Sequence, residues 1–340
     1  MSVPGSGGRL RVVRGPFCPR GLRWESLALG STNALWLGRG EGGDWLCKWY
    51  RYPQVGVHPE AEVAEFLHRQ GVCGVAGFGA RVDRETAEGR MTVGLIQRWV
   101  EGVSGWEKVL DGFRGGAADA ALARRWGKSV GELHRALASG EGGSEFGEEP
   151  LGVADLQAWS WRVERLGERL WERLEGVPPE GVTPAAWARA RLLWVDREEE
   201  WRARARALAG CRVFGCKSRI HGDLHLGQVL DCGVGGAVVV DFEGEPLRAL
   251  EERRLKESPL RDVAGMWRSW AYAGVVGGGA REAVCRMQES FLEGWQESMD
   301  LPGGDWRGFL EGLIWEKAIY EVLYEIQQRP HWLEVPLAAL

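Results

Sequence analysis

Side chains that could do chemistry together occur in one short stretch of the chain. Residues 221–228 read HGDLHLGQ, and a turn leads from them to the apolar run Ala237–Val240, which ends at Asp241. Phosphoryl transfer needs a carboxylate near the acceptor hydroxyl, metal ligands at the nucleotide phosphates, and a cation on those phosphates. In a tight loop, Asp223 is suited to orient the hydroxyl. Gln228 and Asp241 offer the oxygen ligands that Mg²⁺ prefers.

A lysine in the first hundred residues supplies the cation. Lys48 lies in the middle of the predicted strand Trp45–Tyr50, between apolar neighbours, where a charge needs a partner. Glu60 and Glu62 in the next predicted helix compete for this role, and they lie on different helix faces because they are two residues apart. We expect Glu62, which directly precedes Val63, to pair with Lys48 and to hold its ammonium over the α- and β-phosphates.

Two further segments of this region are candidates for nucleotide contacts. Ser31, Thr32 and Asn33 form a turn between two predicted strands, where backbone N–H groups can bind phosphate, although an ordinary turn has the same sequence. The end of the last predicted strand is a hinge candidate that offers backbone groups to adenine. The residues predicted there are Gln97, Arg98, Trp99 and Val100.

Two other residues have the chemistry of a catalytic group but are predicted to be structural. Asp262 opens a predicted helix, so it either caps that helix or ties down the backbone of the loop at His221. His134 lies within a predicted helix and is expected to be a core histidine or a support behind the site.

The elements that must position these residues differ between the two parts of the chain. The first part has short apolar strands joined by Gly-rich turns, and one helix, Pro59–Gln70, with an apolar stripe. From Ala117 onward the pattern is mainly helical. We predict an α+β fold with a small antiparallel β-rich lobe at residues 1–100 and a large helical lobe at residues 101–340. The predicted strands are Leu10–Arg14, Arg23–Leu29, Ala34–Gly38, Trp45–Tyr50 and Thr92–Val100. The predicted helices of the second lobe are Asp119–Ala138, Val153–Leu174, Thr183–Leu208, Leu260–Ala273, Glu282–Ser298 and Trp306–Gln328.

Bulk properties narrow the class of partner. With 340 residues, 44% apolar and 27% charged, the chain is long enough for two domains and has a globular composition. The net charge is only −5 and basic residues are scattered, which argues against nucleic acid. No segment approaches the ~20 apolar residues that span a bilayer, and Met1–Arg14 lacks the apolar stretch of a secretory signal. We expect a cytoplasmic protein that acts on a small molecule.

One face of the last predicted helix is a candidate sugar site. Lys317, Tyr320, Glu321 and Tyr324 recur at a spacing of three to four residues and therefore share a face. A cation, a carboxylate and two phenols suit a disaccharide, whose hydroxyls need donors and acceptors. A structural helix with a polar stripe would show the same pattern.

The order of Lys48, Glu62, the His-Gly-Asp at 221–223 and Asp241 resembles the aminoglycoside phosphotransferase branch of the kinase-like superfamily. Three longer sequence motifs resemble those of the maltokinase family: HGDLHLGQ at 221–228, DFEGEP at 241–246 and SPLRDVAGM at 258–266. Gln228, where related kinases usually carry Asn, is part of this likeness.

The resemblance implies a bilobal, eukaryotic-protein-kinase-like fold that binds ATP and Mg²⁺ between its lobes and phosphorylates maltose at the anomeric hydroxyl. Maltose 1-phosphate would feed α-glucan and glycogen synthesis from trehalose, and trehalose synthase is an implied partner. The resemblance also implies that the C-terminal helix binds the sugar. The expected substrate contacts are His225, Glu243, Lys317, Tyr320, Glu321 and Tyr324. From the same resemblance, we expect the chain to lack most of the N-terminal cap domain that maltokinases carry.

Two alternatives remain open at the level of the sequence. Glucosamine kinases and other small-molecule kinases share the chemistry of Asp223 and Asp241. An aminosugar would favour a cluster of carboxylates, whereas Lys317 would repel its ammonium group. A non-catalytic pseudokinase that binds a partner is the other alternative, and the intact Lys48, Gln228 and acidic pair disfavour it.

Overall fold

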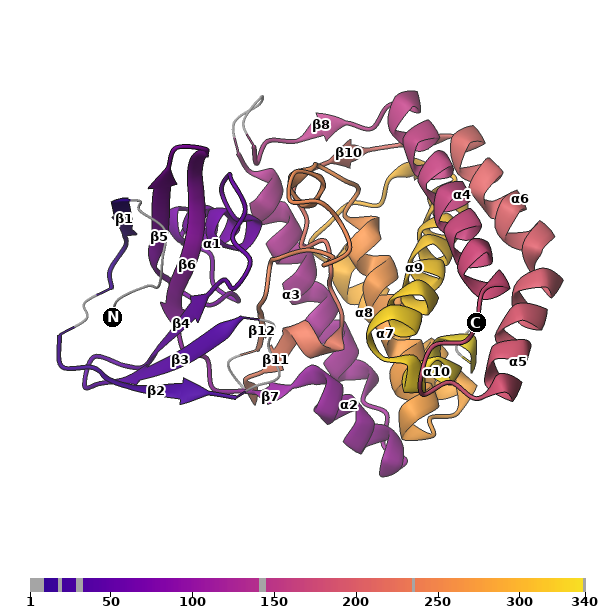
Figure 1. Ribbon diagram of the computed structural model, residues 1–340, viewed down its shortest axis with the longest axis horizontal. Helices are drawn as coiled ribbons and strands as arrows, with labels where there is room; N and C mark the ends of the chain where they lie inside the picture. The colour runs from indigo at the N-terminus through magenta and orange to yellow at the C-terminus, as the bar shows by residue number, and fades with distance from the viewer. Residues whose placement is uncertain (1–8, 18–19, 29–32, 141–144, 234–235, 339–340) are drawn as a thin grey trace. The chain divides into compact units, whose positions relative to one another are not determined.

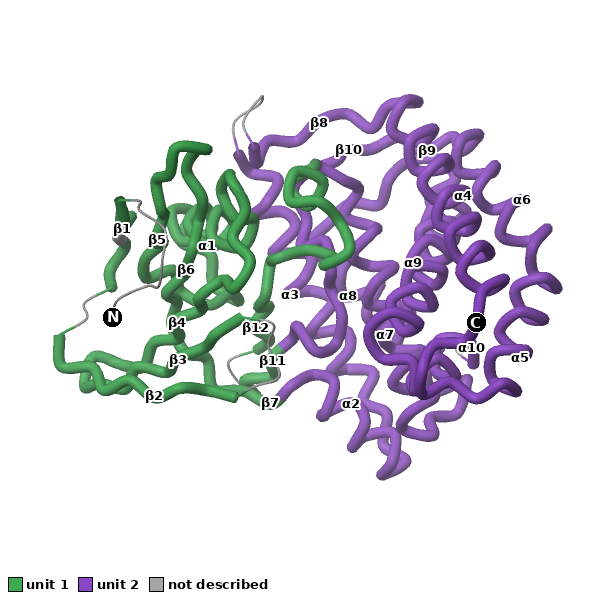
Figure 2. The backbone as a smooth tube through the Cα atoms, in the orientation of Figure 1, with its two compact units in different colours: residues 1–103, 230–255 green, residues 104–229, 256–340 purple. Residues whose placement is uncertain are grey.

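Two stretches that lie far apart in the sequence, residues 1–103 and 230–255, form one compact unit of the computed structural model, which we call unit 1. Residues 104–229 and 256–340 form unit 2 (Figure 2). The structure describes residues 9–17, 20–28, 33–140, 145–233 and 236–338. The sequence predicted a boundary near residue 100 but assigned residues 230–255 to the helical lobe, whereas they cluster with unit 1.

An antiparallel six-stranded sheet forms most of unit 1 (Figure 1). Its strand order is β1-β5-β6-β4-β3-β2, and every neighbouring pair is antiparallel. The predicted strands are all present with ends shifted by up to three residues, and the predicted end at Leu29 lies outside the described residues. The strands are β1 (Arg9–Arg14), β2 (Arg23–Leu27), β3 (Ala34–Arg39), β4 (Trp45–Trp49), β5 (Phe78–Thr86) and β6 (Gly89–Arg98).

The sequence did not predict β5. Charged residues crowd its second half, so it lacks the regular apolar alternation typical of a strand. In the fold these charges have partners: Arg81 pairs with Glu65 at 2.7 Å and with Asp83 at 3.1 Å. The buried Asp83 also accepts a hydrogen bond from Thr92 on β6 at 3.0 Å. Tertiary pairing therefore stabilises a strand that its own residue pattern does not favour.

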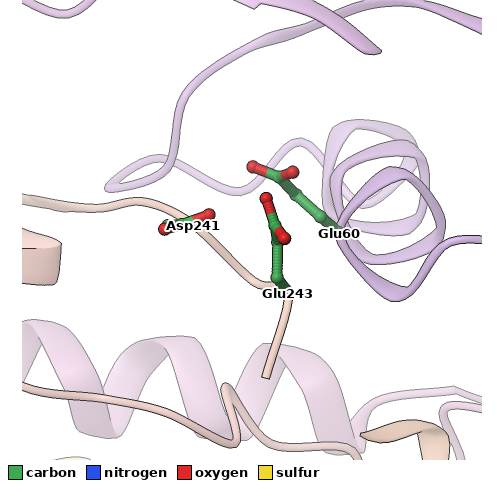
Figure 3. A group of neighbouring side chains, drawn as sticks. All are labelled: Glu60, Asp241 and Glu243. Atoms are coloured by element: carbon green, nitrogen blue, oxygen red, sulfur yellow. The ribbon is translucent and has the colours of Figure 1, made fainter. Parts of the chain in front are cut away.

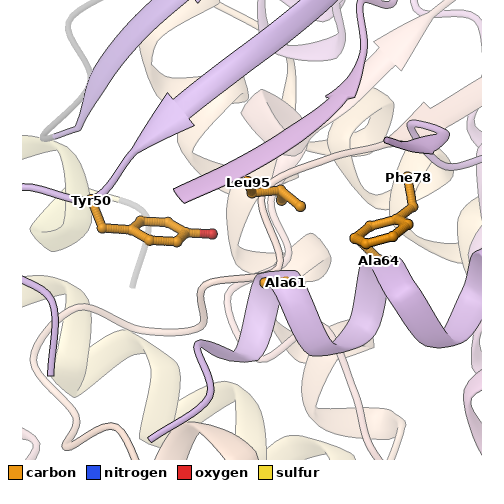
Figure 4. Packing of buried hydrophobic residues seen from close by; sticks show 5 residues of the cluster. All are labelled: Tyr50, Ala61, Ala64, Phe78 and Leu95. Carbon is orange, nitrogen blue, oxygen red and sulfur yellow. The ribbon is translucent and has the colours of Figure 1, made fainter. Parts of the chain in front are cut away.

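Helix α1 (Pro59–Arg69) contributes to the apolar core of unit 1. Pro59 at its first turn fits the helix start, where no intrahelical N–H is needed. Its Ala61 and Ala64 belong to a buried cluster with Tyr50, Phe78 and Leu95 (Figure 4). Complete burial of a side chain such as Phe78 contributes roughly 1.5–3 kcal/mol. This cluster anchors the helix that carries Glu60 beside β4.

The second stretch of unit 1 begins with two short neighbouring strands. These are β11 (Val229–Asp231) and β12 (Ala237–Val239), and the N–H of Cys232 donates to the carbonyl of Gly236 at 2.9 Å. Val239 then donates to the carbonyl of Gly74 at 2.9 Å. This contact joins the returning chain to the segment between α1 and β5, just before Asp241.

Unit 2 is mainly helical, with two-residue strands between the helices. α7 contacts α2, α8 and α9, and its residues are mostly buried. In the part of the chain that the structure describes, no helix is long and apolar enough to span a membrane. The helices are α2 (Gly105–Arg114), α3 (Ala120–Ala138), α4 (Val153–Glu175), α5 (Pro184–Asp196), α6 (Glu198–Gly210), α7 (Leu260–Gly277), α8 (Arg281–Gln296), α9 (Trp306–Gln328) and α10 (Glu334–Ala338); the short strands and 3₁₀ turns include β7 (Val103–Ser104), β8 (Glu149–Pro150), β9 (Val213–Phe214), β10 (Cys216–Lys217), β13 (Gly303–Gly304) and η1 (Leu226–Gln228).

Helices α3 and α8 approach each other closely at two glycines. A Cβ atom at Gly127 would lie 1.9 Å from the carbonyl oxygen of Phe291, and one at Gly294 would lie 1.9 Å from that of Arg124. No larger side chain fits at either position without separating the helices. This close packing fixes His134 on α3 against Trp295 on α8.

Two helical predictions for unit 2 were wrong in detail. The predicted helix Thr183–Leu208 is two helices, α5 and α6, because Arg197 leaves helical geometry at φ −103° and ψ 6°. The helix α2 was not predicted, since its glycines weaken helix propensity. It forms because Val109, Leu110 and Phe113 bury one face.

Candidate active site

Lys48 on β4 lies at the centre of a buried group of charges in unit 1. Its side chain is 7% exposed, and its Nζ lies 3.0 Å from Glu60 and 2.5 Å from Asp241. Glu243 forms a third ion pair with the same ammonium. Burial alone would lower the pKa of Lys48, but the three carboxylates raise it well above its ordinary value. Lys48 is therefore a buried, permanently charged group with the acidic partners that its position demands.

The predicted pairing of Lys48 with Glu62 is wrong. Glu60 is the helical partner of Lys48, whereas Glu62 accepts two hydrogen bonds from Arg254, at 2.7 and 3.0 Å. Residues two apart on a helix differ by about 200° in direction, so only one of the two glutamates faces the strand. The spacing in the sequence is consistent with this choice. Glu60 lies three and four residues before Val63 and Ala64, so it shares a helix face with these two residues, which are buried in the core.

Tyr50 is a member of this cluster that the sequence reasoning missed. Its hydroxyl donates to Glu60 at 2.9 Å, and its ring stacks on His58 with centroids 3.7 Å apart. Burial raises the pKa of Glu60, against the opposing effect of Lys48. Burial and the charge of Lys48 lower the pKa of His58 to about 3, so this imidazole is neutral. The sequence could have indicated this role, because Tyr50 is a polar aromatic residue at the end of the strand that carries Lys48.

Three carboxylates of unit 1 converge on one space (Figure 3). Glu60, Asp241 and Glu243 each offer an oxygen, and these atoms lie within 4.8 Å of one another. Asp241 has φ 70°, a left-handed conformation that no other described residue except glycine adopts, and such strain is concentrated at functional sites. Asn33 donates to Glu243 at 2.7 Å and so fixes its carboxylate. All three carboxylates pair with the ammonium of Lys48, which accounts for their convergence; Asp241, the most exposed of the three at 38%, is the candidate hard oxygen ligand for a divalent cation.

In unit 2, Asp223 lies in a loop whose backbone is held from both sides. Gly222 has φ 83°, which allows the tight turn before Asp223. The N–H of Asp223 donates to Nδ1 of His221 at 3.2 Å. Lys317 on α9 donates to Oδ1 of Asp223 at 2.8 Å. The loop thus presents one carboxylate whose position is set by its own backbone and by a cation from a distant helix.

Asp262 ties down this loop, which is one of its two predicted roles. Its carboxylate accepts from the N–H groups of His221 at 2.7 Å and Gly222 at 2.9 Å, and its Oδ2 lies 2.9 Å from Nε2 of His134. Trp295 donates its indole N–H to Nδ1 of His134 at 2.9 Å. Burial by itself raises the pKa of Asp262, but these hydrogen bonds outweigh it and the net pKa is lowered. His134 is accordingly a buried support behind the loop.

The predicted face of the C-terminal helix is present on α9. Nζ of Lys317 lies 4.8 Å from the centroid of the Tyr320 ring, and the rings of Tyr320 and Tyr324 stack with centroids 6.2 Å apart. Glu321 accepts a hydrogen bond from Arg268 on α7 at 2.8 Å. A carboxylate that the sequence reasoning missed, the buried Glu325, accepts two from Arg329 at 2.6 and 3.0 Å. The face therefore combines stacked rings with acidic groups that already have cationic neighbours.

The other predicted residues have mixed environments. Ser31 and Thr32 lie outside the described residues. The Arg98 guanidinium stacks on Trp45 at 3.9 Å and donates to the carbonyl of Gly42 at 2.7 Å. His225 accepts a hydrogen bond from the N–H of Gly227 and opens the turn η1, which ends at Gln228. The backbone N–H of Trp99 donates to the carbonyl of Asp44, Gln97 is buried on β6, and Val100 follows this strand.

The model of one protein family matches residues 23–297, which is most of the chain: APH, the phosphotransferase enzyme family. The chain belongs to this family. It is 30% identical over 254 residues to a glucosamine kinase of Streptacidiphilus jiangxiensis, a match that covers 69% of this chain and 53% of that relative. It is 29% identical over 319 residues to a glucosamine kinase of Mycolicibacterium smegmatis, covering 87% of this chain and 74% of the relative. The chain thus spans about half the length of the first relative.

Solved structures share the fold. A structure described as glucosamine kinase in complex with glucosamine, ADP and inorganic phosphate matches with a TM-score of 0.72 at 22% identity, over 96% of this chain and 77% of that one. An aminoglycoside phosphotransferase from Alicyclobacillus acidocaldarius matches with a TM-score of 0.54 at 11% identity, over 95% and 88%. The predicted α+β, kinase-like fold and the phosphotransferase family are confirmed. The maltokinase assignment is not supported, because the two relatives described above are named glucosamine kinases.

Proposed function

We propose that this phosphotransferase is an ATP- and Mg²⁺-dependent kinase that phosphorylates a hydroxyl of glucosamine or a closely related aminosugar. The similarity to two glucosamine kinases is the observation that carries the choice of acceptor. The sequence motifs favoured maltose as the acceptor; we now favour glucosamine, which was the alternative. The trehalose synthase contact and the role in glycogen synthesis depended on the maltokinase resemblance and remain predictions without support.

The charges on α9 remove the objection to an aminosugar. The sequence suggested that Lys317 would repel the ammonium group of such a substrate. In the structure its ammonium is neutralised by Asp223 at 2.8 Å and lies over the Tyr320 ring. Glu321 and Glu325 on the same helix are likewise compensated, by Arg268 and Arg329, so they do not by themselves select a cationic sugar. Because the lysine charge is compensated, it no longer excludes a cationic sugar.

The residues of unit 1 fit the nucleotide and its metal. Carboxylate oxygens are the ligands that Mg²⁺ prefers, and we assign Asp241, the most exposed of the three partners of Lys48, as a ligand; Gln228 is the second ligand that the sequence pattern predicts. Bound Mg²⁺ neutralises charge on the nucleotide phosphates. Lys48, held by Glu60, neutralises the α- and β-phosphates, and Asn33 keeps Glu243 in place beside it.

Asp223 is the residue that acts on the acceptor. Its carboxylate accepts the hydrogen bond of the sugar hydroxyl and orients that oxygen for in-line attack on the γ-phosphoryl group. Its loop is rigid because Asp262 binds the two preceding N–H groups. We expect Asp223→Asn to lower kcat by about 10²-fold or more with little change in nucleotide binding. Near-normal turnover of this variant would show that the mechanism is wrong.

A coupled ADP-release assay with Mg-ATP tests the acceptor. The panel comprises glucosamine, N-acetylglucosamine, glucose, maltose and kanamycin. We expect turnover on glucosamine and at least about 10-fold less on N-acetylglucosamine, which has the same ring but no ammonium group. Turnover on maltose alone would restore the maltokinase reading. If none of the sugars is phosphorylated, the proposed acceptor is wrong, whereas the family and the fold are unaffected.

A further inference from the structure

The ion pair between Lys317 and Asp223 is mostly shielded from water. Lys317 Nζ donates to Oδ1 of Asp223 at 2.8 Å, and the two side chains are 13% and 20% exposed. A charge-assisted hydrogen bond in such surroundings is stronger than one on the surface and fixes the orientation of both groups. The carboxylate of Asp223 therefore has one preferred rotation rather than several.

The pair leaves one oxygen of Asp223 for the substrate. A carboxylate accepts hydrogen bonds on both oxygens. Among the described residues, Lys317 is the partner of Oδ1, and the backbone N–H of Asp223 is directed to His221 rather than to its own side chain. Oδ2 receives no hydrogen bond from the part of the chain that the structure describes. Lys317 therefore holds Oδ1 of Asp223, and Oδ2 is available to the acceptor hydroxyl.

The position of Lys317 is itself fixed by its helix. Tyr320, three residues on, places its ring 4.8 Å from Nζ, and Tyr324 stacks against that ring. The neighbouring Glu316 and Ala318 are buried, so α9 cannot rotate to withdraw the lysine. The ammonium of Lys317 thus contacts the Tyr320 ring on one side and the loop of Asp223 on the other.

We propose that Lys317 is a positioning residue for Asp223: it holds Oδ1 so that Oδ2 meets the acceptor hydroxyl. The inference rests on the proposed phosphoryl transfer but not on which sugar is the acceptor. In the step, the hydroxyl oxygen forms a bond to the γ-phosphorus and its proton passes to Oδ2. The bond from the γ-phosphorus to the bridging oxygen breaks, and ADP leaves with that electron pair. Lys317 keeps its proton throughout.

The steady-state constants of Lys317→Met and Lys317→Arg separate positioning from sugar binding. We expect Lys317→Met to lower kcat by about 10-fold or more while the KM for the sugar changes less than about 3-fold, because misorientation of Asp223 affects the transition state. Lys317→Arg retains a cation and should recover most of kcat. A rise in KM with unchanged kcat would make Lys317 a sugar ligand and overturn the proposal. Lys128→Met, an exposed lysine on α3, is the control expected to match the wild type.

A double-mutant cycle tests whether Lys317 acts through Asp223. In the Asp223→Asn background, Lys317→Met should cause less than about a 2-fold further loss of kcat, since residues that act as a unit are not additive. An independent 10-fold loss in that background would overturn the proposal. If Lys317→Met does not fold, as judged by circular dichroism, Lys317→Gln takes its place in the cycle. If the wild type transfers phosphate to no acceptor, the proposed function fails first and this inference fails with it, whereas an active wild type with unaffected variants overturns this inference alone.

Discussion

Glu60 and Glu62 lie two residues apart on α1 and have different tasks. Glu60 is buried and contacts Lys48 and Tyr50, whereas Glu62 binds Arg254 in a partly exposed position. The difference follows from helix geometry, since one residue faces the sheet and the other faces the returning segment 230–255 of the same unit. Two identical side chains on one helix turn therefore give a matched pair for experiment.

Replacing each glutamate by glutamine separates these tasks. Glu60→Gln removes a charge that holds Lys48, so we expect kcat/KM for Mg-ATP to fall by about 10- to 100-fold. Glu62→Gln weakens only a partly solvated pair and should change this constant by less than about 3-fold. Initial-rate kinetics with varied Mg-ATP measure both. Equal losses in the two variants would contradict the assignment of Glu60.

Tyr50 makes a second prediction at this scale. Tyr50→Phe deletes the hydroxyl that donates to the buried Glu60, which loses a hydrogen bond that no solvent can replace. We expect the free energy of unfolding to fall by about 1–3 kcal/mol. Tyr52→Phe is the control, because the side chain of Tyr52 is 85% exposed and its hydroxyl meets water. Urea denaturation of the two variants is the measurement, and equal stability of both would count against the role of Tyr50.

At the scale of elements, three helices of unit 2 meet at the loop that carries Asp223. α3 supplies His134, α7 supplies Asp262 and α8 supplies Trp295, and their hydrogen bonds end at the N–H groups of His221 and Gly222. All of these side chains are buried. The loop that carries Asp223 is thus fixed by helix packing and not by its own short sequence.

The lowered pKa of Asp262 gives this network a pH dependence. A carboxyl whose folded pKa lies below its ordinary value of 3.8 stabilises the fold above that value, and the stabilisation is lost as pH falls through the folded pKa. We therefore expect the free energy of unfolding of the wild type to fall more steeply below about pH 4 than that of Asp262→Asn. At neutral pH the variant should be less stable and slower. Urea titrations from pH 6 to pH 3 measure this; parallel pH profiles would contradict it.

The sequence predicted those elements whose own residues specify them. Helix α9 has the predicted ends, Trp306 and Gln328, because its apolar period is unbroken and Pro330 follows. β5 escaped prediction since its charges find partners only in the folded unit. Lys48, Asp223 and Asp241 were predicted as candidate site residues from their types and spacing, whereas choosing Glu60 over Glu62 required the direction of the helix. Segment 230–255 joins unit 1 through long-range contacts that no local pattern reveals.

At the scale of the whole molecule, the residues of the proposed chemistry belong to two units. Lys48, Glu60 and Asp241 belong to unit 1, whereas Asp223 and Lys317 belong to unit 2. If unit 1 binds the nucleotide, its variants should lose ligand stabilisation, whereas variants of Asp223 and Lys317 should keep it. A ligand at 100 times its dissociation constant stabilises the folded state by about 2.7 kcal/mol.

Thermal unfolding with and without Mg-ADP tests this division. We expect Asp223→Asn to keep the increase in melting temperature that Mg-ADP gives the wild type. Asp241→Asn should lose most of it, because the substitution removes a charged ligand for the metal. Differential scanning calorimetry at saturating Mg-ADP is the measurement. Loss of the increase in Asp223→Asn would show that the nucleotide depends on the catalytic loop as well.

The two carboxylate partners of Lys48, Glu60 and Asp241, are synthesised at different times on the ribosome. Asp241 follows Lys48 by 193 residues, whereas Glu60 follows it by 12. At about 5–20 residues per second, the late carboxylate is synthesised about 10 to 40 s after the lysine. Once Arg98 has been made, and for the rest of that interval, the nascent chain carries all six strands of the sheet and Glu60 but lacks Asp241 and Glu243. Unit 1 therefore completes its charge balance only after the loop of unit 2 that carries Asp223 has been made.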